Sequence, residues 1–188
     1  MLQPVDVLDE TVLEEVATLL TSLRGVWDEE AVDELDHALQ SAARAIDDGA
    51  DDELVLAAAL HDLAHSPLFD AAAATHHDTA ARDWLAPRFG DRVGFLAGSH
   101  VAAKRHLVAT EPGYGSSLTA TSMLSLRAQG GAGVDPELVA HPWWPDALRL
   151  RRYDDAAKDP EAEGVTIDDV LTIAKRVMGQ RQSGRPSR

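Results

Sequence analysis

Residues 53–65 read ELVLAAALHDLAH, and this stretch decides which fold the rest of the chain must form. The run LVLAAAL is apolar on nearly every face of a helix, which is typical of a helix buried at the centre of a bundle. His61, Asp62 and His65 follow in the same apolar setting, where polar groups without partners are costly to bury. In a helix His61 and His65 share one face, and Asp62 lies about 100 degrees round the axis. We therefore predict a buried helix over about residues 52–65 that directs polar groups toward one cavity.

Helical periodicity continues on both sides of this segment, without convincing strand alternation. Asp135-Pro136 has the form of an N-cap followed by proline at the first helical position. Thr166 and Asp169 have the spacing of a capping box. These patterns predict an all-α protein with further helices over about residues 9–23, 29–48, 75–85, 91–107, 118–129, 145–158 and 166–179.

The length and composition indicate one domain without a membrane span. A chain of 188 residues fits a single domain, which we place over residues 1–180, with a disordered tail, RQSGRPSR, over residues 181–188. No run is apolar over the ~18 residues that a membrane span needs, and the first ten residues are acidic rather than basic. We therefore expect a cytoplasmic protein, a monomer or a weak homo-oligomer. No cysteine is present, so any bound metal must use nitrogen and oxygen ligands.

The charge distribution favours a small anionic partner. A formal net charge of -15 repels nucleic-acid phosphates, so we expect no nucleic-acid partner. Within this acidic background the cations Lys104, Arg105, Arg149, Arg151 and Arg152 stand out. Cations gathered inside an acidic protein are useful where a small anion must be held, and the alternative is ordinary surface salt bridges.

Histidines and aspartates recur with a spacing that suits a two-metal site. Hydrogen bonds alone can satisfy the ring nitrogens of any single histidine in a helical core. The buried His61-Asp62 pair is different, because an unpaired buried carboxylate is costly and a bound metal removes that cost. Imidazole and carboxylate ligands suit iron, manganese or zinc. We interpret His106 and His141 as surface or hinge residues, and His76 as pointing away from its neighbour. The six candidate ligands are His37, His61, Asp62, His77, His100 and Asp154.

A distant histidine, an adjacent His-Asp pair and a later aspartate resemble the signature of the HD-domain superfamily. More narrowly, the chain resembles the mixed-valent diiron oxygenases of that superfamily that degrade organophosphonates. The resemblance covers about residues 30–158. It rests on the blocks LDHALQSA, LAAALHDLAH, the His77 helix ending in DWL, SHVAAKRHL, AQGG and RRYDDAAK.

This resemblance implies an all-α HD-domain helical bundle with a buried dinuclear metal site that holds two iron ions, Fe(II)/Fe(III), and uses O2 as co-substrate. It implies that His37, His61, Asp62 and Asp154 bind one iron. His77 and His100 bind the other, and Asp62 bridges the two. It also implies a site for a small anionic organophosphonate, in which His65 and Lys104 are catalytic as well as substrate-binding. The implied substrate-binding residues are Glu30, His65, Lys104, Ser122, Ser125, Gln129 and Arg151.

The chemistry of these residues suits a tetrahedral dianion, since Lys and Arg form charge-assisted hydrogen bonds and hydroxyl groups add further donors. For Ser122, Ser125 and Gln129 the alternative is a solvated helix face. The chain departs from the family at Trp27, where the family commonly has a tyrosine that occupies the second iron until substrate arrives. An indole offers no oxygen to a metal. Ser125, where the family often has threonine, is a milder change.

The expected activity is oxidative cleavage of the carbon–phosphorus bond of a small 1-hydroxyalkylphosphonate, with release of phosphate. Two alternatives remain open from the sequence. One is a metal-dependent phosphohydrolase of the same superfamily, acting on a nucleotide or a small phosphate ester. The other is a non-catalytic sensor module that a metal stabilises.

Overall fold

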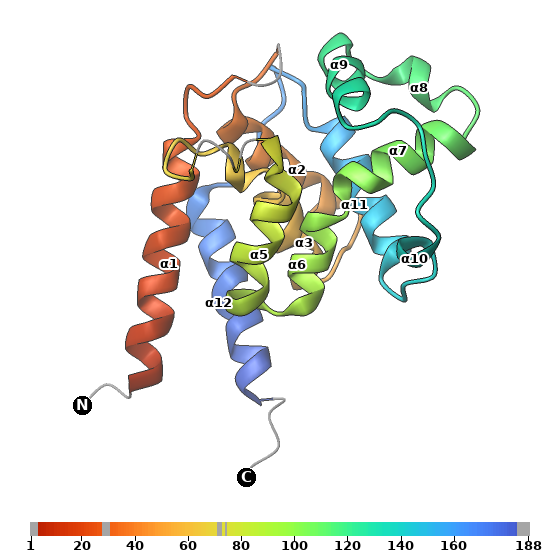
Figure 1. The fold of residues 1–188 in the computed structure, drawn as a ribbon. Coiled ribbons are helices and arrows are strands. Elements are labelled where there is room, and N and C mark those ends of the chain that lie inside the picture. The colour runs from red at the N-terminus through yellow and green to blue at the C-terminus, as the bar shows by residue number, and fades with distance from the viewer. Residues whose placement is uncertain (1–3, 28–30, 71–72, 74, 184–188) are drawn as a thin grey trace.

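The computed structural model describes residues 4–27, 31–70, 73 and 75–183, without the side chains of residues 4–8. Every regular element within these ranges is a helix, which confirms the predicted all-α class (Figure 1). One element is a 3-10 helix, η1 (Leu63–His65), and the others are α-helices. The α-helices are α1 (Pro4–Ser22), α2 (Glu34–Asp47), α3 (Asp52–Leu60), α5 (His77–Phe89), α6 (Asp91–Gly98), α7 (His100–Thr110), α8 (Tyr114–Ser117), α9 (Ala120–Ala128), α10 (Pro136–Val139), α11 (Trp144–Ala156) and α12 (Ile167–Ser183).

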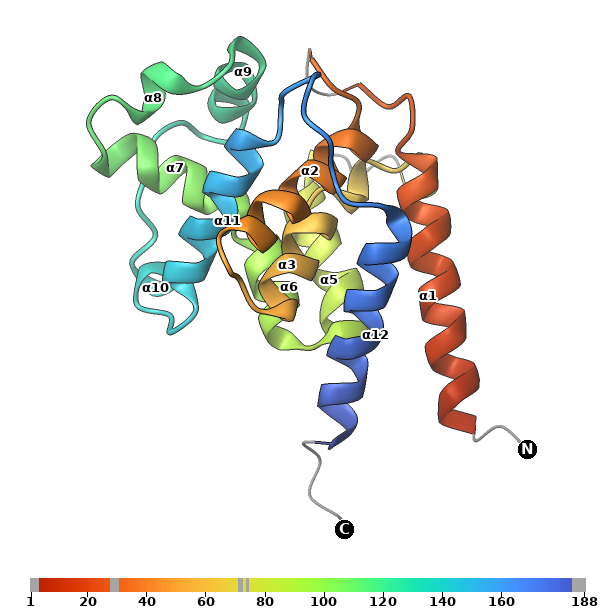
Figure 2. The same cartoon turned by 180° about the vertical axis from the view of Figure 1, so that it is seen from behind.

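Helix α3 lies at the centre of the bundle. All residues from Leu54 to Leu60 are buried, and α2, α6, α11 and α12 pack around them. Figures 1 and 2 show α3 enclosed by these helices from both sides. The carboxylate of Asp51 accepts the Leu54 backbone N–H at 3.0 Å and caps the first turn. The prediction of a central buried helix is confirmed.

The predicted end of this helix at residue 65 is wrong. Helix α3 ends at Leu60, and the chain unwinds through His61 and Asp62 before η1. The backbone then makes 3-10 type bonds, with the His65 N–H donating to the Asp62 carbonyl at 2.9 Å. In this arrangement the Asp62 carboxylate lies 3.1 Å from His61 Nε2 and 3.9 Å from His65 Nε2, so the three side chains belong to one cluster.

Several other predicted boundaries also differ. The predicted helix over 91–107 is two helices, α6 and α7, which meet at Ser99. Helix α2 begins at Glu34 rather than at residue 29, because the Asp33 carboxylate accepts the Asp36 N–H at 3.0 Å and sets the N-cap there. Pro87 does not break α5, which continues to Phe89 and stops at Gly90, whose φ of 105° favours glycine.

The C-terminal helix extends beyond its predicted end near residue 179. Helix α12 continues to Ser183, so residues 181–183 of the expected disordered tail are helical. The Arg181 guanidinium donates to the Arg88 carbonyl at 2.6 Å, and the Gln182 amide donates to Asp9 at 2.7 Å. These bonds tie the last turn to the ends of α5 and α1. Residues 184–188 lie outside the described residues.

Both predicted helix caps are confirmed. Asp135 accepts the N–H groups of Glu137 and Leu138, and Pro136 is the first residue of α10. Thr166 and Asp169 exchange hydrogen bonds, with the Asp169 N–H on the Thr166 hydroxyl at 3.1 Å and the Thr166 N–H on the Asp169 carboxylate at 2.9 Å.

Helices α7, α8 and α9 form a lobe beside the bundle, next to α11 (Figure 1). Helix α9 lies against α7, and the chain returns from it through the Gly130–Gly133 turn. Arg105 holds this turn, because its Nε donates to the Gly131 carbonyl at 2.9 Å while its own carbonyl accepts the Gly133 N–H. Among the described residues, no helix is both long and apolar enough to cross a bilayer.

Candidate metal centre

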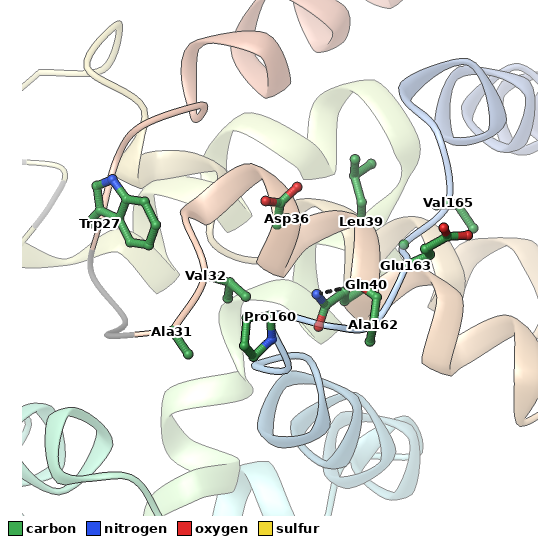
Figure 3. A pocket seen from close by; sticks show the side chains of 11 residues that line it. Trp27, Ala31, Val32, Asp36, Leu39, Gln40, Pro160, Ala162, Glu163 and Val165 are labelled. Atoms are coloured by element: carbon green, nitrogen blue, oxygen red, sulfur yellow. Dashed lines mark hydrogen bonds between the residues drawn. The ribbon is translucent and has the colours of Figure 1, made fainter.

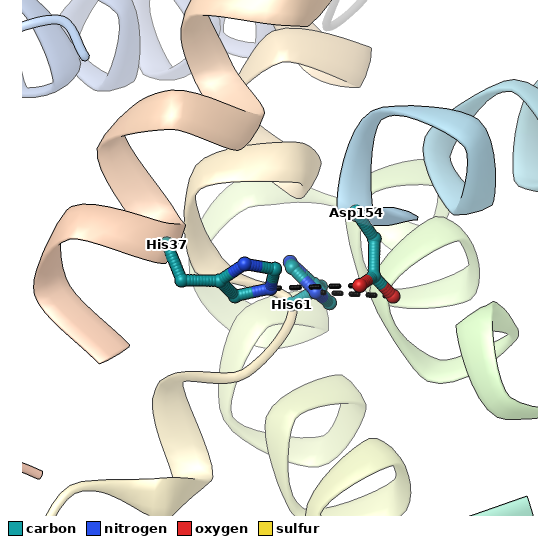
Figure 4. Close-up of side chains that lie close together, drawn as sticks. All are labelled: His37, His61 and Asp154. Atoms are coloured by element: carbon teal, nitrogen blue, oxygen red, sulfur yellow. Dashed lines mark ion pairs between the residues drawn. The ribbon is translucent and has the colours of Figure 1, made fainter. Parts of the chain in front are cut away.

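Three of the predicted ligands meet in the core from helices that are far apart in sequence. His37 comes from the first turn of α2, His61 from the turn after α3, and Asp154 from the last turn of α11 (Figure 4). The Asp154 carboxylate lies 3.5 Å from His37 Nε2 through one oxygen and 3.6 Å from His61 Nε2 through the other. We call His37, His61 and Asp154 the inner group; each is 1–3% exposed.

Asp62 lies between the inner group and a second set of histidines. Its Oδ2 is 3.1 Å from His61 Nε2 and 3.5 Å from His37 Nε2. Its Oδ1 is 3.3 Å from His100 Nε2, 3.6 Å from His77 Nε2 and 3.9 Å from His65 Nε2. The two oxygens of one carboxylate therefore face two different groups of imidazoles.

The second set of histidines is equally close-packed, and we call His65, His77 and His100 the outer group. The Nε2 atoms of His77 and His100 are 3.0 Å apart, and the His65 and His77 ring centres are 4.5 Å apart. His65, which the resemblance assigned to the substrate, thus lies beside the predicted ligands. The six side chains predicted as ligands do converge.

Backbone carbonyls orient three of the imidazoles. The Nδ1 atoms of His37, His61 and His100 donate to the carbonyl oxygens of Ala157 at 2.9 Å, Ala58 at 2.9 Å and Ala97 at 2.6 Å. When Nδ1 carries the proton, Nε2 keeps its lone pair, and all three Nε2 atoms point into the cluster. This arrangement of outer hydrogen bonds is typical of histidines that bind metals.

Two buried polar atoms of the cluster lack a hydrogen-bond partner from the protein. Within the described residues, His61 Nε2 and Asp62 Oδ1 are buried without a hydrogen-bond partner. Such atoms carry a desolvation cost that a bound cation removes. The donor set contains only imidazole nitrogen and carboxylate oxygen, which fits iron, manganese or zinc. The residues present therefore fit a metal centre.

The pKa shifts differ between the two groups of histidines. Burial by itself raises the pKa of Asp62, but the neighbouring His61 and His100 outweigh it and hold that pKa well below its usual range. Burial lowers the pKa of His100 well below its usual value and lowers the pKa of His77 as well. Burial by itself lowers the pKa of His61 and His37, but Asp62 and Asp154 outweigh it and raise the pKa of His61 well above its usual value and the pKa of His37 as well. These two imidazoles therefore favour the protonated form and release a proton when a cation binds.

Two lysines lie beside the cluster, each paired with a serine of α9. Lys104 Nζ donates to Ser125 Oγ at 2.8 Å, and Lys158 Nζ donates to Ser122 Oγ at 2.9 Å. Lys158 Nζ also lies 3.7 Å from Asp154 Oδ1. Burial lowers the pKa of Lys104 to about 8. The sequence reasoning missed Lys158, and the signal that could have found it is its position four residues after Asp154, just beyond the end of α11.

Arg151 is engaged in a network of its own. Its guanidinium donates through NH1 to Asp154 and through NH2 to Asp155, and its Nε donates to the Tyr114 hydroxyl at 3.1 Å. Arg151 is 3% exposed. The sequence reasoning did not identify Tyr114 or Asp155, since neither has the spacing of a ligand.

A cavity of about 550 Å³ opens over the outer group. Its walls carry His65, His77, Ser125 and Gln129, so four of the predicted site residues share this cavity. Among the described residues no hydrogen bond satisfies Gln129 Oε1, which is buried. The cavity supplies a route by which a small polar molecule reaches the cluster.

Trp27 lies elsewhere. It is 64% exposed and lines a separate cavity of about 430 Å³ together with Gln40 and Pro160 (Figure 3). That the gating device of the family differs in this chain, because Trp27 replaces the tyrosine, stays a prediction. Glu30, predicted to bind substrate, lies outside the described residues.

The fold and the cluster define an HD-type helical bundle, in which a distant histidine, a His-Asp pair and a later aspartate meet in the core. The chain is 34% identical over 152 residues to the hydroxymethylphosphonate dioxygenase of Gimesia maris, a match that covers 76% of this chain and 74% of that protein. It is 33% identical over 144 residues to the [1-hydroxy-2-(trimethylamino)ethyl]phosphonate dioxygenase (glycine-betaine-forming) of Leisingera caerulea, which covers 71% and 73%. No protein-family model matches the chain.

The chain therefore belongs to the family of the phosphonate dioxygenases, and it is an enzyme of that type. The resemblance seen in the sequence is confirmed. The family and the His/Asp cluster together indicate a reaction that uses a metal and O2.

Proposed function

We propose that this enzyme cleaves the carbon–phosphorus bond of a small 1-hydroxyalkylphosphonate with O2. Carbon 1 becomes a carboxylate, the phosphonate leaves as phosphate, and the two oxygen atoms of O2 balance the products. The observation that carries the proposal is the position of Asp62. Its two oxygens lie within 3.1–3.9 Å of imidazole nitrogens on opposite sides, as a carboxylate that bridges two metal ions must.

Two iron ions, as Fe(II)/Fe(III), are the proposed cofactor. His37, His61, Asp154 and Asp62 would hold one, and His77, His100 and Asp62 would hold the other. When bound, such a pair would supply Lewis acidity and a first electron to activate O2, while the net electrons that reduce O2 come from the C1–H and C–P bonds of the substrate. Burial of the cluster keeps bulk water away and strengthens every charge interaction inside it.

The phosphonate is proposed to bind between α7, α9 and the end of α11. Lys104 and Lys158 already donate to Ser125 and Ser122, so four donors converge where the three elements meet. A phosphonate dianion accepts charge-assisted hydrogen bonds from both lysines and neutral ones from both hydroxyls. The guanidinium nitrogens of Arg151 that bind Asp154 and Asp155 each keep a second N–H, which Arg151 can direct to the same anion.

His65 is proposed to act on the 1-hydroxyl group. Its imidazole lines the cavity over the outer group, and its Nε2 lies 3.9 Å from Asp62 Oδ1. From this position Nε2 can hold the hydroxyl proton while carbon 1 is oxidised. Gln129, on the opposite wall, can accept or donate a hydrogen bond to the substituent on carbon 1.

The test is phosphate release from hydroxymethylphosphonate and from a panel of longer 1-hydroxyalkylphosphonates, under air and without oxygen. We expect release under air with about one O2 consumed per phosphate, iron near two per chain, and a mixed-valent paramagnetic signal that the active phosphonate perturbs. Phosphate release that continues without oxygen would contradict the proposal and favour metal-dependent hydrolysis.

A further inference from the structure

The hydroxyl group of Tyr114 lies at the start of a hydrogen-bond chain that ends on a predicted metal ligand. Tyr114 belongs to α8, in the lobe beside the bundle (Figure 1). Its hydroxyl donates to Asp155 Oδ2 and accepts the Arg151 Nε–H at 3.1 Å. Arg151 in turn donates to Asp155 Oδ1 and to Asp154 Oδ2. One tyrosine, one arginine and two neighbouring carboxylates thus form a closed network.

This network fixes the rotation of the Asp154 carboxylate. Asp154 Oδ2 faces His61 Nε2 at 3.6 Å, and Asp154 Oδ1 faces His37 Nε2 at 3.5 Å, so both distances depend on the angle of one carboxylate plane. The planar guanidinium of Arg151 imposes a defined geometry on the oxygens it binds. Arg151 lies only one turn before Asp154 on α11, and a long side chain held from its own helix alone would keep much rotamer freedom. The external restraint comes from Tyr114, 37 residues earlier in the chain.

The surroundings of Tyr114 hold its ring and its hydroxyl in place. Tyr114 is 5% exposed, and the Arg152 guanidinium lies over its ring at 5.0 Å. Gly113 precedes it with a φ of 87°, a conformation that favours glycine and that sets the direction in which α8 leaves the turn. Burial raises the pKa of Tyr114, so the hydroxyl remains a donor at neutral pH.

We propose that Tyr114 is a positioning residue for the metal ligand Asp154, acting through Arg151 and Asp155. The proposal rests on the metal centre proposed above but does not depend on which phosphonate is the substrate. It also links the lobe to the core, because the α8–α9 segment carries both the tyrosine that orients Asp154 and the two serines proposed to bind the phosphonate.

The chain contains a matched control. It has two tyrosines, and the second, Tyr153, precedes Asp154 on α11. The Tyr153 hydroxyl also donates to an aspartate, Asp48, but this aspartate is exposed and lies outside the metal centre. Tyr114→Phe and Tyr153→Phe therefore remove the same atom and the same type of bond, and only the first bond leads to Asp154.

The experiment measures transfer of iron from the two-iron protein to a competing chelator, followed by absorbance, with wild type and both variants side by side. We expect Tyr114→Phe to weaken iron binding at one of the two sites by about 10-fold, since loss of an outer hydrogen-bond partner typically costs 10–100-fold in metal affinity. Tyr153→Phe should release iron at the wild-type rate. Circular dichroism melts establish that each variant is folded.

Asp155→Asn is the second variant, and it serves if Tyr114→Phe does not fold. It should weaken the same site, and combination with Tyr114→Phe should add little, because both substitutions break one network. Wild-type iron retention in Tyr114→Phe, or equal losses in Tyr114→Phe and Tyr153→Phe, would overturn the positioning role and leave the proposed function intact. A wild-type protein that holds no iron would overturn both.

Discussion

The inner and outer groups of the metal centre share Asp62 but differ in how the fold holds them. The side chains of His37, His61 and Asp154 are 2%, 1% and 4% exposed. The side chains of His65 and His77 are each 13% exposed. The inner group is therefore part of the core, whereas two of the outer histidines line a cavity.

The difference follows from what holds each side chain. His37 Nδ1 donates to the Ala157 carbonyl after α11, and the Asp154 carboxylate accepts a hydrogen bond from Arg151. His65 is the last residue of η1, and His77 is the first residue of α5. Among the described residues, no hydrogen bond holds the Nδ1 atom of either. Ligands without outer hydrogen bonds are oriented less strictly, so we expect the outer metal to exchange more readily.

The largest effect should come from the residue that the two groups share. Asp62→Ala removes the carboxylate that both groups use, so we expect loss of both metal ions and no detectable phosphate release. The measurement is iron per chain by elemental analysis, together with the activity assay. Asp78→Ala is the control. Asp78 lines the cavity over the outer group, and within the described residues it forms no ion pair with the cluster. An Asp62→Ala protein that retains two irons would mean that the groups do not share a ligand.

A substitution in one group should separate the two sites. His77→Ala should reduce bound iron from two to one per chain with the fold retained, whereas His37→Ala should remove the inner iron and also destabilise the protein. His37→Ala breaks a buried bond between α2 and the end of α11, which costs about 1–3 kcal/mol when a partner is left unsatisfied. Iron analysis and thermal melts measure both, with His76→Ala as the control for His77. Complete unfolding of His77→Ala would show that the residue is structural.

The two lysines test whether the phosphonate binds between α7, α9 and the end of α11. Lys104→Met and Lys158→Met should each raise KM for the phosphonate about 10-fold to 100-fold, since a hydrogen bond to a charged group contributes about 1.5–3 kcal/mol. Iron content should stay near wild type in Lys104→Met. Lys175→Met, on the exposed side of α12, is the control and should leave KM unchanged. Unaltered KM in both Lys104→Met and Lys158→Met would place the anion elsewhere.

The smallest effect should be a pH dependence that belongs to Lys104. Because burial lowers its pKa to about 8, its ammonium group is charged below that pH and becomes neutral above it. Affinity for the phosphonate should therefore decline as the pH rises from about 7 to about 9. Plots of KM against pH for wild type and Lys104→Met measure this contribution. The decline should be absent from Lys104→Met, and an identical decline in both proteins would assign it to another group.

The sequence predicted correctly those features that depend on residues close together in the chain. Apolar residues on every face of residues 54–60 predicted the central helix, and the Asp135 and Thr166 caps were predicted from short spacings. It failed at the ends of α3 and α2 and at the junction of α6 and α7. After the end of α3, His61 Nδ1 donates to the Ala58 carbonyl. At the start of α2, the Asp33 carboxylate caps the helix later than the periodicity predicts. The periodicity of apolar residues does not show whether such a side-chain bond ends the helix or the helix continues.

The candidate site shows the same difference between features of single residues and contacts between helices. The six candidate ligands, with the His61-Asp62 pair among them, were identifiable because imidazoles and carboxylates in an apolar setting are costly without a cation. Lys158, Tyr114 and Asp155 were not identified, because their importance lies in contacts with residues of other helices, such as the bond from Lys158 to Ser122.

The sequence by itself determined the helical class, the central segment and the chemistry of the ligands, because periodicity and donor atoms are properties of the residues. The tertiary structure alone decided that Asp62 directs one oxygen to each group, that the inner group is sealed while His65 and His77 border a cavity, and that Tyr114 reaches Asp154 through Arg151. The reason is physical: atoms separated by more than a hundred residues meet at bonding distance only when packing sets the relative positions of their helices, as for His37 and Ala157.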